Sequence, residues 1–151
     1  MTHAALWKRA VLEDGELILP MMEVFCRLLH IPWDAAERRD QVRYLAENRA
    51  AGGVWFTTVE GVPAGYFVLT FGFSFEFRGR YGLFDELYVD ERFRKLGLGG
   101  SALDTIKAIA PGLGLRRLLI EVAVESPHLA TYYTRHGFAL REYRLHTREV
   151  E

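Results

Sequence analysis

A strict alternation of residue types over residues 66–77 constrains the fold of this chain more than any other feature. Large apolar residues stand at every second position: Phe67, Leu69, Phe71, Phe73, Phe75 and Phe77. A period of two is that of an extended strand, so the pattern predicts a long strand that buries one heavily aromatic face.

Helical and extended patterns are mixed on either side of this strand. Further strands are predicted at residues 5–12, 54–60, 83–89 and 116–124, with a final strand or hairpin at 138–148. Helices are predicted at 14–30, 34–51, 98–110 and 126–137, the first two capped by Asp14 and Asp34. The first helix is expected to bury Leu17, Met21, Phe25 and Leu28. The order predicts an α/β (or α+β) fold with about four helices around a mixed sheet of 6–7 strands.

Length and charge limit the class of protein. The chain has 151 residues and a formal net charge of −1, so we expect one domain over residues 1–151. The absence of a basic surplus argues against nucleic acid and anionic membranes as partners. No apolar run predicts a membrane span or a signal peptide. The single cysteine, Cys26, excludes an internal disulfide and fits a cytoplasmic protein.

Residues 94–100 read RKLGLGG and precede the third predicted helix. The first turn of a helix presents N–H groups without intrahelical partners, and glycines let a ligand approach them. Such a site suits phosphate or pyrophosphate, with Arg94 and Lys95 adding positive charge. The alternative is that the glycines only allow tight packing of helix on strand. The absence of G-K-[ST] excludes a Walker A loop, and the late position of the run disfavours a dinucleotide site.

Three segments together resemble the GNAT superfamily of acetyl-CoA-dependent N-acetyltransferases. The run VDERFRKLGLGGSAL is similar to the family's motif A, with the core Arg/Gln-x-x-Gly-x-Gly/Ala at residues 94–99. ELYV resembles the family's fourth strand, and YYTRHGF resembles the end of its motif B. The resemblance implies a GNAT-like fold with strands four and five splayed. It also implies direct transfer of an acetyl group from acetyl-CoA to an amine of a small molecule, peptide or protein, in a ternary complex and without a metal. Many relatives are dimers, so a homodimer is a further expectation.

The resemblance also implies which residues hold coenzyme A. Its pyrophosphate is expected beside Arg94 and Lys95, on the amides of Leu96, Gly97, Leu98, Gly99, Gly100 and Ser101. The backbone of Leu87 and Val89 is expected to pair with the pantetheine arm, with the Val89 N–H polarising the thioester carbonyl. Ser126 stands where the family commonly has an asparagine that contacts the coenzyme, and can cap the fourth helix.

Catalysis in this family needs a base for the amine and a donor for the departing thiolate. Tyr133 matches the family's tyrosine general acid, although it could be only a core aromatic. Asp85 and Glu86 are the first candidates for the base and Glu121 the next, directly or through water. Neighbours on a strand point to opposite faces, so at most one of Asp85 and Glu86 should enter a given cleft. Each could instead be a solvated or ion-paired carboxylate. The alternative function is a coenzyme A-binding sensor or interaction module without catalysis.

Overall fold

The computed structural model of the chain describes residues 5–151, which form two compact units. The first unit ends at Glu121 and the second runs from Val122 to Glu151. The first contains, in order, β1 (Lys8–Arg9), the 3-10 turn η1 (Leu12–Asp14), α1 (Gly15–Leu28), α2 (Ala35–Glu47), β2 (Gly52–Val59), β3 (Val62–Ser74), β4 (Gly79–Val89), η2 (Glu91–Phe93), α3 (Leu98–Ile109) and β5 (Leu115–Ile120). The second contains α4 (Pro127–Arg135). None of the helices described is long and apolar enough to cross a bilayer.

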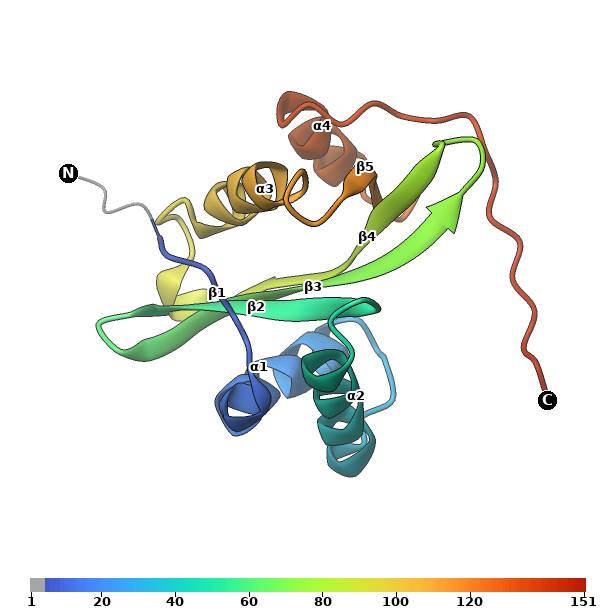
Figure 1. Cartoon of the computed structure of the whole chain (residues 1–151). Coiled ribbons are helices and arrows are strands. Elements are labelled where there is room, and N and C mark those ends of the chain that lie inside the picture. Colours follow the sequence, from blue (N-terminus) through green and yellow to red (C-terminus); the bar gives the residue numbers. More distant parts are fainter. Residues whose placement is uncertain (1–4) are drawn as a thin grey trace. The chain divides into compact units, whose positions relative to one another are not determined.

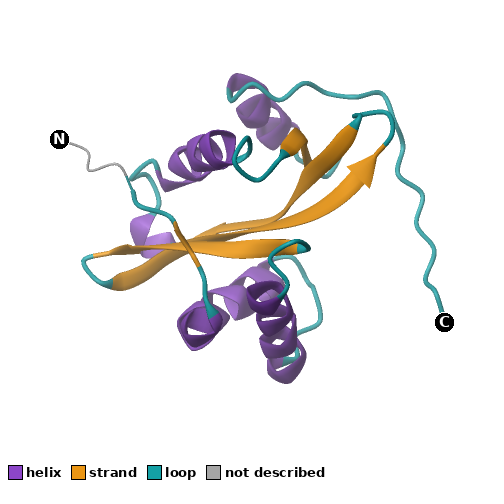
Figure 2. Ribbon diagram, in the orientation of Figure 1, coloured by secondary structure: helices purple, strands orange, loops and turns teal. Residues whose placement is uncertain are grey.

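The strands form one mixed sheet in the order β1-β2-β3-β4-β5 (Figure 2). Strands β1 to β4 pair antiparallel, and β4 pairs with β5 in parallel after the crossover through α3. The prediction of 6–7 strands is wrong, since the sheet of residues 5–151 has five. Strand β5 ends at Ile120, and residues 138–151 form no strand. Leu140, Tyr143 and Leu145 do not recur at every second position, so a strand there would bury no continuous apolar face.

In the first unit, helices cover both faces of the sheet: α1 and α2 lie on one face and α3 on the other (Figure 1). The core under α1 and α2 includes Ile18, Met22, Tyr66, Val68 and Tyr88. In β3, Phe67 instead stacks on Trp55, with ring centroids 5.3 Å apart, and contacts Phe84 at 5.9 Å. Alternate residues of β3 therefore supply two separate cores, as a period of two predicts.

The buried aromatic face predicted for residues 67–77 is only partly correct. Phe67 and Leu69 are fully buried, whereas Phe73 and Phe75 are 67% and 93% exposed. Phe73 stands one residue before the end of β3 at Ser74, and Phe75 lies in the turn at residues 75–78, which has no sheet face to bury an aromatic ring.

The predicted apolar face of α1 is partly correct, since Met21 is buried and Phe25 is half-buried against the core. Leu17 and Leu28 are exposed, while Ile18, Met22 and Cys26 are buried. These three residues repeat every four positions, so they too lie on one face of a helix.

The two predicted helix caps have different outcomes. The Asp34 carboxylate accepts hydrogen bonds from the amides of Ala36 and Glu37 at 2.8 and 3.0 Å, so this cap is confirmed. Asp14 precedes α1 but makes no cap bond to it. Its carboxylate accepts from the Val11 amide at 2.9 Å instead, because the turn before α1 brings that donor within reach.

Candidate functional site

The glycine-rich segment connects β4 to α3 through two left-handed residues. Lys95 has φ 69° and Gly97 has φ 77°, a region that L-residues seldom adopt. Gly97 is the residue immediately before α3, so its backbone turns the chain into the helix. Leu98 is buried and anchors the first turn, while Leu96 is 56% exposed. The glycine-rich segment is therefore anchored where α3 begins, and the residues before the helix are open to solvent.

The start of α3 presents a group of backbone donors. The amides of residues 96–100 donate to no backbone carbonyl within residues 5–151. The Ser101 amide differs, because it donates to the Gly97 carbonyl at 3.0 Å. The Ser101 hydroxyl also has partners, accepting from Trp7 Nε1 at 3.1 Å and donating to the Ala5 carbonyl at 3.4 Å. The five preceding amides, at the positive end of the helix, are thus the donors available to an anion.

Positive charge at this site comes from Arg94 and Lys95. Both side chains are exposed, and neither forms a salt bridge with any residue described. Arg94 Nε donates to the Val89 carbonyl at 3.2 Å, which holds this side chain beside the end of β4. Arg92 contributes less, because Asp90 accepts two hydrogen bonds from its guanidinium at 2.9 and 3.0 Å.

One edge of β4 is unpaired next to this loop. The ladder between β4 and β5 ends at Phe84 and Ile120, whereas β4 continues to Val89, paired in the part of the chain described only with β3. The Asp90 amide donates to Ala64 at 2.9 Å on the β3 side. Since successive residues of a strand direct their N–H groups to opposite sides, the Leu87 and Val89 amides point away from β3. The two residues predicted to meet the pantetheine arm therefore lie with their amides at the free edge.

A β-bulge lies where the β4–β5 ladder ends. In the pairing of β3 with β4, Val68 is opposite Glu86 and Leu69 is opposite Phe84, so Asp85 is the extra residue. The alternation assumed for Asp85 and Glu86 is therefore interrupted, and a bulge re-aims the side chains around it. Asp85 is exposed and has no salt bridge to a described residue. Surrounding protein raises the pKa of Asp85 by desolvation, and the charges of Glu86 and Glu121 raise it further.

Glu86 has a different environment, formed by residues that sequence reasoning did not single out. Its carboxylate accepts from Arg38 Nη1 at 2.7 and 3.1 Å and from the Tyr66 hydroxyl at 2.8 Å. Arg38 Nη2 also lies 3.0 Å from Cys26 Sγ, so the guanidinium joins α1, α2 and β4. The pKa of Tyr66 is raised by burial and then by Glu86. No local motif marks Arg38 or Tyr66, because their partner is distant in sequence.

Tyr133 and Ser126 belong to the second unit. Tyr133 lies on α4, is half-buried and packs against Tyr132 and Phe138, with centroids 5.5 and 6.1 Å away. Burial raises the pKa of the Tyr133 hydroxyl, and Tyr132 raises it further. Ser126 precedes α4, but its hydroxyl makes no cap bond, so that part of the prediction is wrong. Its carbonyl accepts from Leu129 at 3.0 Å instead, with Pro127 in the first helical position.

The first unit is thus an α/β structure in which the free edge of β4 is followed by a helix, α3, whose first amides are open. The acetyltransferase (GNAT) family matches residues 18–138, which is most of the chain. The chain belongs to this family, and the resemblance seen in its motifs is confirmed. Acetyl-CoA is the acyl donor that this family uses.

Solved structures with the same fold agree with this assignment. An integron cassette protein, HFX_CASS3, from the mobile metagenome of Cole Harbour Salt Marsh is 27% identical with a TM-score of 0.85, over 96% of this chain and 90% of that chain. A possible acetyltransferase from Clostridium difficile 630 has a TM-score of 0.86 at 17% identity, over 97% and 98%. A predicted acetyltransferase from Clostridium acetobutylicum, solved with acetyl-CoA, has a TM-score of 0.77 at 14% identity, over 95% and 96%. None of the curated proteins matches the chain.

Proposed function

We propose that this protein transfers an acetyl group from acetyl-CoA directly to an amine on a small molecule, peptide or protein. The observation that carries the proposal is the continuity of two sets of backbone donors. The free edge of β4 at Leu87 and Val89 leads into the open amides at the start of α3. An extended ligand with a pyrophosphate at one end fits such a track, because a strand edge binds extended chains and a helix start binds phosphate.

Acetyl-CoA supplies the acetyl group as a thioester, and the protein positions it. Arg94 and Lys95 would neutralise the phosphates, since neither side chain forms a salt bridge with a carboxylate in residues 5–151. The amides of Leu87 and Val89 would hold the arm, with Val89 polarising the thioester carbonyl. We propose that β4 and β5 diverge beyond the pair Phe84–Ile120, leaving room for the arm between them.

We propose Asp85 as the base that takes up the proton of the acceptor amine. The acceptor nitrogen must lose a proton as it bonds to the acetyl carbon and the carbon–sulfur bond breaks. Asp85 has no ion pair in residues 5–151, and its raised pKa makes it a stronger base than an ordinary aspartate. Glu86 is held by Arg38 and Tyr66, so we propose that it has a structural role. From the family resemblance we also propose that Tyr133, on α4 of the second unit, donates a proton to the departing thiolate.

Calorimetric titration with acetyl-CoA and desulfo-CoA, followed by a thiol-release assay over a panel of primary amines, tests the proposal. Binding together with amine-dependent thiol release supports the enzyme. Binding without release for any amine class would favour a coenzyme A sensor or interaction module. Absence of binding to both coenzyme species would overturn the proposed site.

A further inference from the structure

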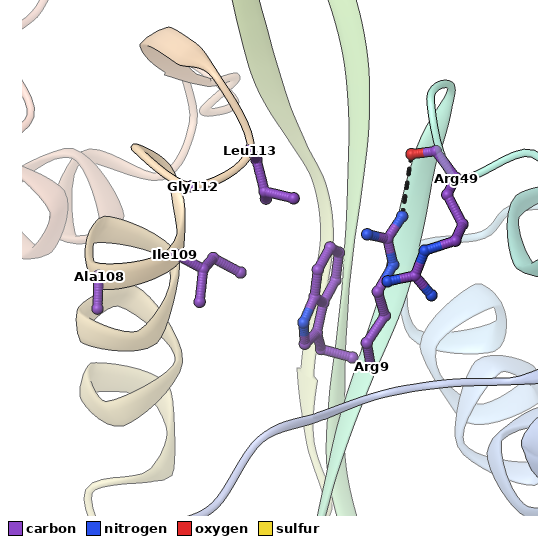
Figure 3. A pocket seen from close by; sticks show the side chains of 7 residues that line it. Arg9, Arg49, Ala108, Ile109, Gly112 and Leu113 are labelled. Atoms are coloured by element: carbon purple, nitrogen blue, oxygen red, sulfur yellow. Dashed lines mark hydrogen bonds between the residues drawn. The ribbon is translucent and has the colours of Figure 1, made fainter.

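A pocket of about 350 Å³ lies in the first unit, at the opposite end of α3 from the glycine-rich loop. Figure 3 shows Arg9 and Arg49 along one side and Ile109 and Leu113 along the other. The indole of Trp55 also lines the pocket. The arginines come from β1 and from the residues after α2, and the apolar pair comes from the last turn of α3 and the loop after it. The pocket therefore combines two cations with an apolar wall.

The position of Arg9 is set by several contacts. Its guanidinium carbon lies 4.9 Å from the centre of the Trp55 ring, and Nη2 donates to the carbonyls of Arg49 and Gly52 at 3.0 and 2.5 Å. Gly53 leaves the space for this arrangement. A Cβ at Gly53 would lie 2.7 Å from Arg9 Nε and 2.9 Å from a Trp55 ring carbon. These contacts together hold the Arg9 guanidinium over the indole.

The charges of Arg9 and Arg49 are not neutralised within residues 5–151. Neither side chain forms a salt bridge there, and Figure 3 shows the two guanidinium groups next to each other. Burial lowers the pKa of Arg9, and the charge of Arg49 lowers it further, so the two cations repel. Arg9 uses only Nη2 in hydrogen bonds to described residues, and the Arg49 guanidinium donates to none of them. The hydrogen bonds to the two carbonyls therefore occupy Arg9 Nη2 alone. The other nitrogens of the two guanidinium groups have no hydrogen-bond partner among the described residues.

We propose that this pocket binds a small molecule carrying a carboxylate or phosphate group. The anion accepts hydrogen bonds from Arg9 and Arg49 and relieves their repulsion, and its apolar part packs against Ile109, Leu113 and Trp55. An arginine fork is suited to both kinds of oxyanion, and the two are distinguished by separate titrations. The site is independent of the coenzyme track, because it lies at the other end of α3.

The test follows the indole N–H resonance of Trp55 in the full-length protein, assigned with Trp55→Phe. Inorganic phosphate and acetate are titrated separately, with chloride used to hold ionic strength constant. We expect a saturable shift of the Trp55 resonance. The anion that binds more tightly, phosphate or acetate, identifies the ligand class. Arg49→Gln should weaken its binding about tenfold or more, since a hydrogen bond to a charged group contributes about 1.5–3 kcal/mol.

Two control variants and one variant that disrupts the pocket separate this site from general charge effects. Arg43→Gln on α2 makes the same change in net charge and should leave the affinity unchanged. Lys95→Gln should also leave it unchanged, which excludes a response transmitted from the start of α3. Gly53→Ala should abolish the shift by displacing both Arg9 and the Trp55 ring, and circular dichroism checks that this variant folds. Arg49 is exposed, so its variant tests the proposal even if Gly53→Ala unfolds. A shift that is absent, does not saturate or is unaltered in Arg49→Gln overturns the proposal.

Discussion

Arg38 Nη1 lies 2.7 Å from Oε2 and 3.1 Å from Oε1 of Glu86, joining α2 to β4 across 48 residues of sequence. The two side chains are only 15% and 10% exposed. The neighbouring carboxylate of Asp85 has no such partner among residues 5–151. Two adjacent acids in the sequence therefore have different chemical environments, and the first two predictions test this difference.

Arg38→Met should destabilise the fold by about 3–5 kcal/mol, because Glu86 would be left as an unpaired buried charge. Urea unfolding measures the loss. Arg39→Met is a matched control on the same helix, since Arg39 pairs with Glu16 where the side chains are 50% and 70% exposed. An exposed pair of this kind contributes little to stability, so the Arg39→Met variant should lose much less than Arg38→Met. Equal losses in the two variants would contradict a structural role for the Arg38–Glu86 pair.

Asp85→Asn should lower turnover by about 10²-fold or more once an acceptor amine is known, because the base is removed. In the unsubstituted protein, turnover should fall as pH drops through the pKa of Asp85. Since that pKa is raised, the fall should begin at a higher pH than for an ordinary aspartate. The measurement is turnover against pH at saturating acetyl-CoA. If the acidic limb persists unchanged in Asp85→Asn, another group is the base.

The ionised carboxylate of Asp85 should also destabilise the folded protein at neutral pH. Its pKa is higher in the folded protein than in the unfolded chain, so the unfolded chain loses this proton first as pH rises. The free energy of unfolding therefore falls as pH rises from the unfolded pKa to the folded pKa of Asp85. Above the folded pKa, the whole loss of stability is present. Asp85→Asn should be more stable than the parent at pH 7, with the gain vanishing below the ordinary aspartate pKa of about 3.9. Denaturant unfolding at both pH values checks this, and a gain of equal size at the two pH values would contradict it.

Gly97→Ala should weaken acetyl-CoA binding and cost about 1–2 kcal/mol of stability, because φ at this position is 77°. A Cβ there would meet no atom within 4 Å, so the cost is backbone strain and not a clash. Gly61→Ala is the matched control: its φ is 80° and its Cβ also meets nothing, but it lies in the β2–β3 turn. We expect equal stability losses, with the affinity loss, measured by calorimetry, confined to Gly97→Ala. Equal affinities would remove the phosphate-site interpretation.

Tyr133→Phe should lower turnover by about 10²-fold with little change in acetyl-CoA affinity or in stability. The substitution removes only the hydroxyl, which has no hydrogen-bond partner in residues 5–151, and keeps the ring contacts with Tyr132 and Phe138. Steady-state kinetics and calorimetry measure the two quantities. Unchanged turnover would show that the thiolate obtains its proton elsewhere. Tyr132→Phe, one position away on α4, is the control expected to retain activity.

Features that depend on neighbouring residues were predictable from the sequence. Asp34 caps α2 because the donors that it accepts from lie two and three residues away. The glycines of residues 97–100 predicted a helix start with open backbone, which depends on φ and on the helix geometry of the same few residues. The aromatic alternation was correct at Phe67 and Leu69 and failed at Phe73, near the end of β3, and at Phe75, which lies beyond the strand.

The sequence by itself determined the family, the order of the main elements and the helix start that suits an anion, because each depends on short-range periodicity and backbone conformation. Only the tertiary structure decided which acid is free, because Arg38 and Tyr66 reach Glu86 from other elements of the fold. It also brought Arg9, Arg49 and Trp55 together around one pocket. The charge and burial of a side chain depend on the distant elements that pack around it, and a local pattern does not specify these.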